Sequence, residues 1–367
     1  MRYEIFRKLL FKLGSEKSYD LSMKILEFGN KNPWIFQIIG NNYRVKDEIL
    51  HQKILGLDFH NPIGLGAGLD RNGVALEALQ TVGFGAVEIG TVTPKPQDKN
   101  VEQRMDLLEK NRSVQRYVGF ESRGMEVVKR NLSKFNVTIP VSISIARNNN
   151  TSNEDTIKDY EALVTTLANS CDIFTINLSS PSTPKLQKLQ SIEFIKELFV
   201  RLTKLTNNPI AFKISPDFDY EDALVLCKAA VDSGAKILII SDSSSDYNLS
   251  PNIKEHKGGV SGKLLTHKSR EFLRAISKEF FKKAVIVSSG GIDNAEEAYE
   301  RIKLGASLVQ IYSSFVFEGP EITKELNKGI IELLKADGYS NISEAVGVDI
   351  KFDTQKEEPI ELVQEGR

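Results

Sequence analysis

From residue 62 onward, short apolar runs alternate with longer charged segments along the chain. The runs are rich in Ile and Val, and such near-continuous hydrophobicity is typical of strands that are buried on both faces of a parallel sheet. They cover residues 62–67, 86–92, 141–145, 173–178, 210–214, 237–240, 284–287 and 308–311. Segments between them have the length and periodicity of amphipathic helices, most clearly at 155–170, 191–205, 220–233, 268–281 and 294–304.

Eight strand–helix units predict a closed parallel (β/α)8 barrel, a TIM barrel, in preference to an open doubly wound sheet. The length of 367 residues would allow two average domains. Barrels of this kind, however, routinely use about 250 residues or more as one unit. We therefore expect an N-terminal helical extension over residues 1–45, one barrel over 46–336 and a C-terminal tail over 337–367.

The N-terminus combines basic and apolar residues in two helical segments, 1–14 and 19–30. Arg7, Lys8 and Lys12 interrupt the first apolar stretch, which argues against a secretory signal. No stretch reaches the roughly 18 uncharged apolar residues of a transmembrane helix. An element lying on a membrane surface and a helical cap over one end of the barrel both fit this pattern, and the sequence alone favours the cap.

The composition narrows the class of protein further. Lys and Arg number 48 against 49 Asp and Glu, so no basic excess points to a nucleic-acid partner. The two cysteines, Cys171 and Cys227, lie in apolar stretches, which argues against a disulfide framework. Four scattered histidines predict no metal site. We expect a protein of the reducing cytoplasm.

Glycines and polar residues gather where the predicted strands end, and in a TIM barrel the C-terminal strand ends build the active site. Gly290 and Gly291 follow the seventh strand, residues 312–314 follow the eighth, and a Gly-rich segment, 258–262, follows the sixth. Backbone N–H groups in such loops bind phosphate. Each glycine pair in isolation fits a plain tight turn, but their occurrence at adjacent strand ends favours a phosphate site.

Two further polar residues stand out against their surroundings. Lys213 lies at the end of the apolar strand 210–214, so it needs either an anionic or electron-rich ligand or a neighbouring carboxylate. Ser180 lies at the mouth of the fourth strand, in a loop that Pro181 and Pro184 stiffen. Serine is a weak base without a proton relay, and no histidine falls at a strand end to form a Ser-His-Asp triad. By itself Ser180 is better read as a loop hydroxyl.

Several motifs, however, resemble the class 2, quinone-dependent dihydroorotate dehydrogenases. They lie at residues 61–70, 83–94, 177–184, 258–262 and 305–313, within a similarity that covers 1–334. The resemblance implies FMN, bound by Ala67, Gly68, Thr91, Lys213, Gly262, Gly291, Tyr312 and Ser313. It also implies a reaction in which a base, at the position of Ser180, removes the C5 proton of dihydroorotate while C6 gives hydride to flavin N5. A quinone would then reoxidise the flavin.

The same resemblance implies substrate contacts, and here the chain departs from the family. The implied substrate-binding residues are Arg71, Arg116, Phe120, Asn177, Ser182 and Asp242. In the family, lysine stands in place of Arg71 and asparagine in place of Arg116, Ser182 and Asp242. Two alternatives therefore stay open: a divergent paralogue that acts on another small molecule, and a non-catalytic flavin-binding barrel. Since buried charges are expensive alone, we expect Arg116 and Asp242 to lie close together, bonded directly or bridged by a ligand.

The N-terminal helices would, by the same resemblance, form a quinone tunnel on the membrane surface. Tyr19 stands where the family has a histidine in these helices, and Leu107 where it has an arginine near the tunnel. The resemblance thus adds peripheral attachment to the inner face of the membrane as an alternative to a purely cytoplasmic protein.

Overall fold

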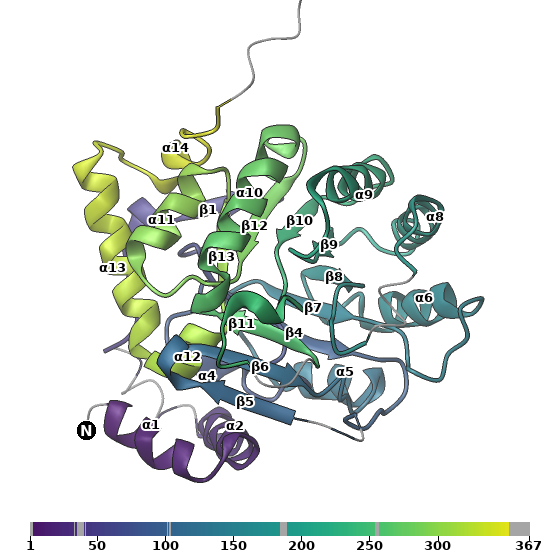
Figure 1. Ribbon diagram of the computed structural model, residues 1–367, viewed down its shortest axis with the longest axis horizontal. Coiled ribbons are helices and arrows are strands. Elements are labelled where there is room, and N and C mark those ends of the chain that lie inside the picture. Colours follow the sequence, from purple (N-terminus) through teal and green to yellow (C-terminus); the bar gives the residue numbers. More distant parts are fainter. Residues whose placement is uncertain are drawn as a thin grey trace, which may run out of the picture.

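Eight parallel strands close into a barrel (Figure 1), in the order in which the sequence predicts them. The structure is a computed structural model that describes residues 3–351 except 33, 35–39, 41, 101, 103, 184–188 and 254–256. The barrel strands are β3 (Ile63–Leu65), β4 (Ala86–Val92), β7 (Val141–Ile145), β8 (Ile173–Asn177), β9 (Ile210–Ile214), β10 (Ile237–Ile240), β12 (Val285–Ser289) and β13 (Leu308–Ile311). Closure comes from β13 pairing with β3, where Val309 lies opposite Ile63. The predicted (β/α)8 barrel is confirmed.

Helices surround the barrel and bury their apolar faces on it. They are α4 (Leu76–Thr81), α5 (Met125–Leu132), α6 (Thr156–Leu167), α8 (Ile192–Leu202), α9 (Tyr220–Asp232), α10 (Thr266–Phe280), α11 (Ala295–Lys303) and α13 (Glu321–Ala336). The five helices that the periodicity predicts are all present, and α10 begins two residues earlier than expected, at Thr266. In the segment predicted as a tail, α14 (Ile342–Ala345) packs with buried Ile342, and Asp349 N donates to Lys303 O. Residues 352–367 of that segment lie outside the described residues.

The predicted N-terminal helical extension is confirmed as α1 (Tyr3–Lys12) and α2 (Ser15–Lys31), at the bottom of Figure 1. Tyr3 Oη donates to Val316 O over 2.9 Å, and the Arg7 guanidinium donates to Phe317 O. Both carbonyls belong to α12 (Ser313–Glu318), the helix that follows the last barrel strand. Among the described residues, no helix is long and apolar enough to cross a membrane.

A small antiparallel sheet, which the sequence pattern did not predict, accompanies the C-terminal end of the barrel. It consists of β5 (Arg104–Leu108), β6 (Ser113–Tyr117) and β11 (Gly259–Gly262), in the order β11-β6-β5. The first two strands come from the chain between β4 and β7, and β11 comes from the chain after β10. Register pairs Gly259 with Arg116, so this sheet carries residue 116 toward the barrel opening.

The opposite end of the barrel is closed by a hairpin of β1 (Gln52–Ile54) and β2 (Leu57–Phe59). Phe59 of the hairpin is 1% exposed and packs in a cluster with residues of the barrel interior. The other members of that cluster are Ile173, Ala211, Ile237, Ile239, Val287 and Leu308. The hairpin thus completes the core at the end of the barrel where no site is expected.

We expect Phe59→Ala to lower the free energy of unfolding by about 3–5 kcal/mol, because it removes a buried aromatic ring and leaves a cavity. Urea denaturation followed by circular dichroism measures the change. Leu55→Ala, in the turn of the same hairpin and 44% exposed, is the matched control and should stay within about 0.5 kcal/mol. Equal losses in the two variants would contradict a core role for Phe59.

Candidate active site

A cavity of about 150 Å³ lies at the C-terminal ends of the strands, bounded in part by β6 and β11. We call it the barrel-end cavity. Every residue predicted for catalysis, cofactor or substrate lines it, so the structure brings all of them together. These residues are Ala67, Gly68, Arg71, Thr91, Arg116, Phe120, Asn177, Ser180, Ser182, Lys213, Asp242, Gly262, Gly291, Tyr312 and Ser313.

Lys213 reaches the cavity from β9 and is flanked by two carboxylates. Its Nζ lies 3.6 Å from Asp242 Oδ1 and 3.9 Å from Glu88 Oε1. Burial by itself would lower the pKa of the Lys213 ammonium, but Asp242 and then Glu88 outweigh it, and the pKa rises above its ordinary value. The residue is therefore a cation at neutral pH. The sequence left two explanations for Lys213 open, a ligand or a neighbouring carboxylate. The structure contains neighbouring carboxylates, and the side chain also lines the barrel-end cavity.

Glu88, which the sequence analysis missed, joins three barrel strands beneath the cavity floor. Its side chain is 1% exposed, and its Oε2 accepts hydrogen bonds from Thr175 Oγ1 (3.2 Å) and Gln310 Nε2 (2.9 Å). These partners lie on β8 and β13, while Glu88 lies on β4. The available signal was a charged residue inside an apolar run, the same signal that identified Lys213.

In the part of the chain that the structure describes, Asp242 and Arg116 do not bond to each other, and each has its own hydrogen-bond partners. Asp242 accepts hydrogen bonds from Ser179 Oγ (2.6 Å) and Ser243 N (2.8 Å), in addition to its contact with Lys213. Arg116 Nη1 donates to Gly68 O (3.2 Å) and Tyr312 Oη (3.3 Å). No ion pair between described residues joins Arg116 to Asp242, so the directly bonded form of that prediction is wrong. Both side chains nevertheless line the same cavity.

Arg71 is almost buried and has two partners that the sequence did not indicate. Its guanidinium lies 4.4 Å from the centroid of the Tyr19 ring and forms an ion pair with Glu121. Burial, and to a lesser extent the nearby Arg116, lowers the pKa of Arg71 to about 10. Arg71 therefore remains charged at neutral pH.

A second cavity, of about 280 Å³, lies among α1, α2, β5, β6 and α12 and is lined mainly by apolar residues. We call it the apolar cavity. Tyr19 and Leu107, the two residues that the resemblance places near a quinone tunnel, both line it. Tyr312 lines this cavity and the barrel-end cavity alike. Tyr19, which stacks on Arg71, donates to Leu69 O over 2.7 Å. The two cavities are therefore neighbours that share a wall.

The glycine turns predicted to bind phosphate require glycine for steric reasons. A Cβ on Gly291 would lie 2.4 Å from Thr266 N, and one on Gly262 would lie 2.6 Å from Arg112 O. Both residues also have positive φ, at 77° and 98°. Ser261 Oγ lies 2.9 Å from Ser313 Oγ, and this contact links β11 to the start of α12.

Asn177 and Thr91 occupy the floor of the cavity in fixed positions. Asn177 Nδ2 donates to Thr91 Oγ1 (3.2 Å), and its Oδ1 accepts from Ser179 N (3.2 Å). Ser182 Oγ donates to Arg116 O (3.1 Å), which connects the loop after β8 to β6. Phe120 is buried at the cavity wall. Polar groups therefore lie on several sides of the cavity.

Comparison with known proteins agrees with this geometry. The family model for dihydroorotate dehydrogenase matches residues 49–334. A relative from a Sulfurovum species, named dihydroorotate dehydrogenase (quinone), is 44% identical over 95% of this chain and 99% of its own length. One from a Nitratiruptor species, with the same name, is 43% identical over 96% of this chain and 100% of its own.

Solved structures give the same result. The dihydroorotate dehydrogenase of Eimeria tenella in complex with ferulenol superposes with a TM-score of 0.79 at 26% identity, covering 90% of this chain and 95% of that one. Its ligand-free form gives a TM-score of 0.80 and covers 90% and 99%. The chain therefore belongs to the dihydroorotate dehydrogenase family, within its class 2, quinone-dependent branch.

Proposed function

We propose that this chain is an FMN-dependent enzyme that oxidises dihydroorotate to orotate and passes the electrons to a quinone. One observation carries the proposal: a polar cavity at the barrel end, lined by every predicted cofactor and substrate residue, shares a wall with an apolar cavity. The first cavity suits a charged substrate and a flavin, and the second suits a hydrophobic electron acceptor.

The residues around the barrel-end cavity fit FMN. Three buried polar atoms that line it, Gln310 Oε1, Ser314 Oγ and Arg71 Nε, have no hydrogen-bond partner among the described residues. Such atoms favour a polar ligand, because leaving them unpaired costs about 1–3 kcal/mol each. The backbone N–H groups of Gly262, Gly291 and Ser313 would hold the phosphate. Bound FMN would accept a hydride from the substrate and pass its electrons on.

The protein's own residues supply charge and proton transfer. We assign Lys213 to the flavin ring, where a cation stabilises the reduced, anionic form. We assign removal of the substrate C5 proton to Ser180 Oγ, because Ser180 lines the barrel-end cavity together with Phe120 and Asn177. Asn177, fixed by its bonds to Thr91 and Ser179, orients the substrate.

We propose that Arg116 binds the carboxylate of the substrate. Lys213 is paired with carboxylates and Arg71 with Glu121, whereas Arg116 contacts only neutral oxygens among its described partners. A guanidinium without a counter-ion in a partly buried site favours an anionic ligand. Asp242 can accept an N–H of the substrate ring from the Lys213 side of the cavity.

The proposal is tested by adding dihydroorotate to the oxidised protein under anaerobic conditions. We expect the flavin absorbance to bleach and then to return when a quinone is added. Ser180→Ala should slow bleaching by roughly 10²–10⁴-fold, which is the usual contribution of a general base. Dithionite must still bleach this variant, which shows that the flavin is bound. Protein that takes up no FMN, or FMN that dithionite but not dihydroorotate reduces, would contradict the proposal.

The role of Arg116 has its own test. Arg116→Ala should raise the KM for dihydroorotate by roughly 10–100-fold, since a hydrogen bond to a charged group contributes about 1.5–3 kcal/mol. Steady-state kinetics measure the change. Arg123→Ala, an exposed arginine in the chain that follows β6, is the control and should leave KM unchanged. An unaltered KM in the Arg116 variant would show that the carboxylate binds elsewhere.

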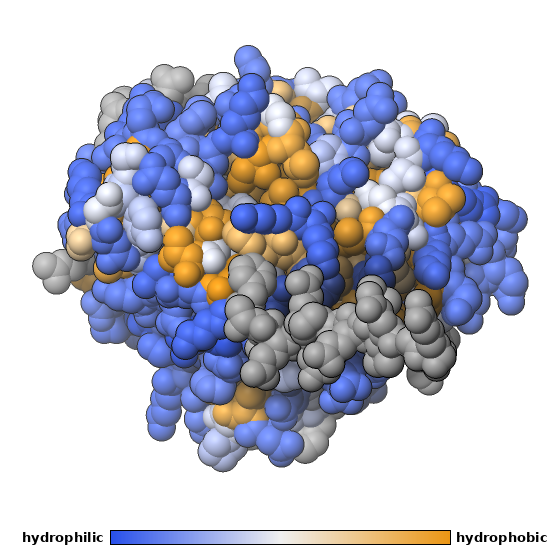
Figure 2. Space-filling view, turned by 90° about the horizontal axis from the view of Figure 1, so that it is seen from above, coloured by the Kyte–Doolittle hydropathy of each residue, from blue (hydrophilic) through white to orange (hydrophobic). Residues whose placement is uncertain are grey.

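We also propose that α1 and α2 attach the protein to the inner face of the membrane. The exposed surface of these helices and of the turn between them carries the apolar side chains of Ile5, Leu9, Leu13, Leu21, Ile25 and Phe28. Lysines 8, 12 and 24 lie on the same two helices, which together make an interfacial element. Figure 2, seen from the side opposite these helices, shows a mainly hydrophilic face with apolar areas between.

Replacing Leu9 and Phe28 by Glu should therefore weaken sedimentation with anionic lipid vesicles by about tenfold or more, since each buried apolar side chain contributes roughly 1.5–3 kcal/mol. The control replaces Val200 and Val225, which are exposed on α8 and α9, by Glu and should sediment like the parent. Both proteins should keep dihydroorotate-dependent bleaching. The membrane proposal fails if the two double variants sediment alike.

A further inference from the structure

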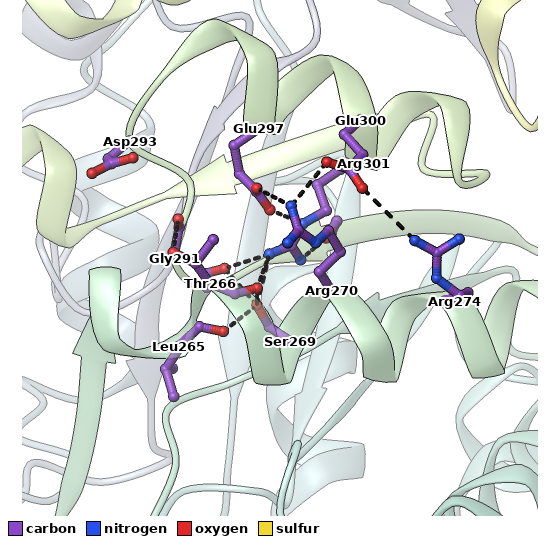
Figure 3. Close-up of polar contacts among 12 residues, drawn as sticks. Leu265, Thr266, Ser269, Arg270, Arg274, Gly291, Asp293, Glu297, Glu300 and Arg301 are labelled. Carbon is purple, nitrogen blue, oxygen red and sulfur yellow. Dashed lines mark hydrogen bonds and ion pairs between the residues drawn. The ribbon is translucent and has the colours of Figure 1, made fainter. Parts of the chain in front are cut away.

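A fully buried arginine lies directly beneath the Gly290–Gly291 turn. Arg301, on α11, has no exposed side-chain surface, and its Nε donates to Glu297 Oε1 over 2.6 Å (Figure 3). Burial lowers the pKa of Arg301, while the Glu297 carboxylate opposes that shift. Burying a charge and its partner is expensive unless hydrogen bonds satisfy both groups. Arg301 is not among the residues assigned to the flavin, the substrate or proton transfer, so its burial needs another explanation.

Three segments of the chain meet at its guanidinium (Figure 3). Nη1 donates to Ser288 Oγ on β12 over 3.1 Å. Nη2 donates to Thr266 O (2.8 Å) and Ser269 Oγ (2.9 Å) in the first turn of α10, and lies 3.3 Å from Gly290 O. A guanidinium offers five N–H donors in one plane, so it can join all three segments, which a lysine ammonium on a single stem cannot do with the same geometry.

The partners of Arg301 in turn hold the glycine turn. Ser269 Oγ donates to Gly290 O and Thr266 Oγ1 donates to Gly291 O, each over 2.7 Å. The Gly290 carbonyl is thus drawn toward the Arg301 cluster. In a trans peptide the C=O and the following N–H point in opposite directions. The N–H of Gly291 therefore points away from the cluster, and among the described residues it has no backbone acceptor.

The geometry points to Arg301 as a positioning residue for the FMN phosphate: by fixing the Gly290 carbonyl, it aims the Gly291 N–H at the phosphate. This inference rests on the proposed FMN site. Its specific consequence is selectivity between FMN and riboflavin, which differ only in the phosphate. A defect confined to this turn lowers affinity for FMN and leaves affinity for riboflavin nearly unchanged.

Arg270 provides a matched control within the same cluster. Its Nη1 donates to Glu297 Oε2 and Glu300 Oε2, each over 2.8 Å, and none of its described hydrogen bonds or ion pairs reaches the turn. Replacing Arg270 disturbs the same carboxylate, Glu297, without removing a bond to Gly290. A loss of phosphate selectivity in an Arg301 variant but not in the Arg270 variant thus isolates the contact with the turn.

The experiment titrates flavin-free full-length protein with FMN and with riboflavin, following the quenching of flavin fluorescence. We expect the parent to prefer FMN strongly. Arg301→Met should lower FMN affinity by roughly tenfold or more, a change of about 1.4 kcal/mol, and riboflavin affinity by less than about twofold. Arg301→Lys should behave like Arg301→Met, because lysine keeps the charge but lacks the planar guanidinium that bonds to several segments at once. Arg270→Met should match the parent with both flavins.

Two further measurements keep the inference open to refutation. Ser269→Ala removes the hydroxyl between Arg301 and Gly290 and should reproduce the selective loss even if the Arg301 variants fail to fold. The ³¹P resonance of bound FMN should shift in the variants that lose selectivity. Equal losses of FMN and riboflavin affinity, or no loss of either, would overturn the positioning role and leave the proposed function intact. A parent protein that binds riboflavin as tightly as FMN would overturn the phosphate site itself.

Discussion

The Lys213 ammonium is buried inside the barrel between Glu88 and Asp242, and the polar arrangement of the site follows from that placement. An unpaired ion in such a position would cost several kcal/mol or lose its charge, and the two carboxylates keep Lys213 charged by offsetting that cost. Glu88 binds Thr175 and Gln310 below the cavity, and Asp242 binds Ser179 at its side. Strands β4, β8, β9 and β13 and the chain that follows β10 are thereby connected through polar side chains.

Two kinds of environment lie side by side at this end of the molecule. One is the barrel-end cavity, whose lining is rich in glycine and charged groups, and the other is the apolar cavity under α1 and α2. Tyr312 lines both cavities, and the Arg71–Tyr19 stack joins a residue of the first to a residue of the second. A ring bound in one cavity and a hydrophobic molecule in the other would lie on opposite sides of Tyr312.

The barrel strands were predictable because burial on both faces leaves a continuous apolar signal in each of them. The sheet of β5, β6 and β11 was not, because its short strands mix apolar and polar residues and pair residues far apart in the sequence, such as Val260 and Gln115. Glu121 was missed for a similar reason. Its pairing with Arg71 depends on how the loop after β3 meets the chain after β6, and no local pattern contains that information.

The residues that line the barrel-end cavity were identifiable as a set, but their partners were not. The expectation that Arg116 and Asp242 lie close together, bonded directly or bridged by a ligand, followed from the cost of two isolated buried charges. In the structure each charge has other partners. Asp242 lies beside Lys213, and Arg116 turns to the Gly68 carbonyl and the Tyr312 hydroxyl. Relative to two asparagines, Arg and Asp add charges that cancel, so the net charge of the cavity is unchanged. The distribution of charge does change, because negative charge is added beside Lys213 and positive charge is added beside Gly68. An anionic substrate would consequently be drawn toward the β6 side of the cavity, where Arg116 is anchored.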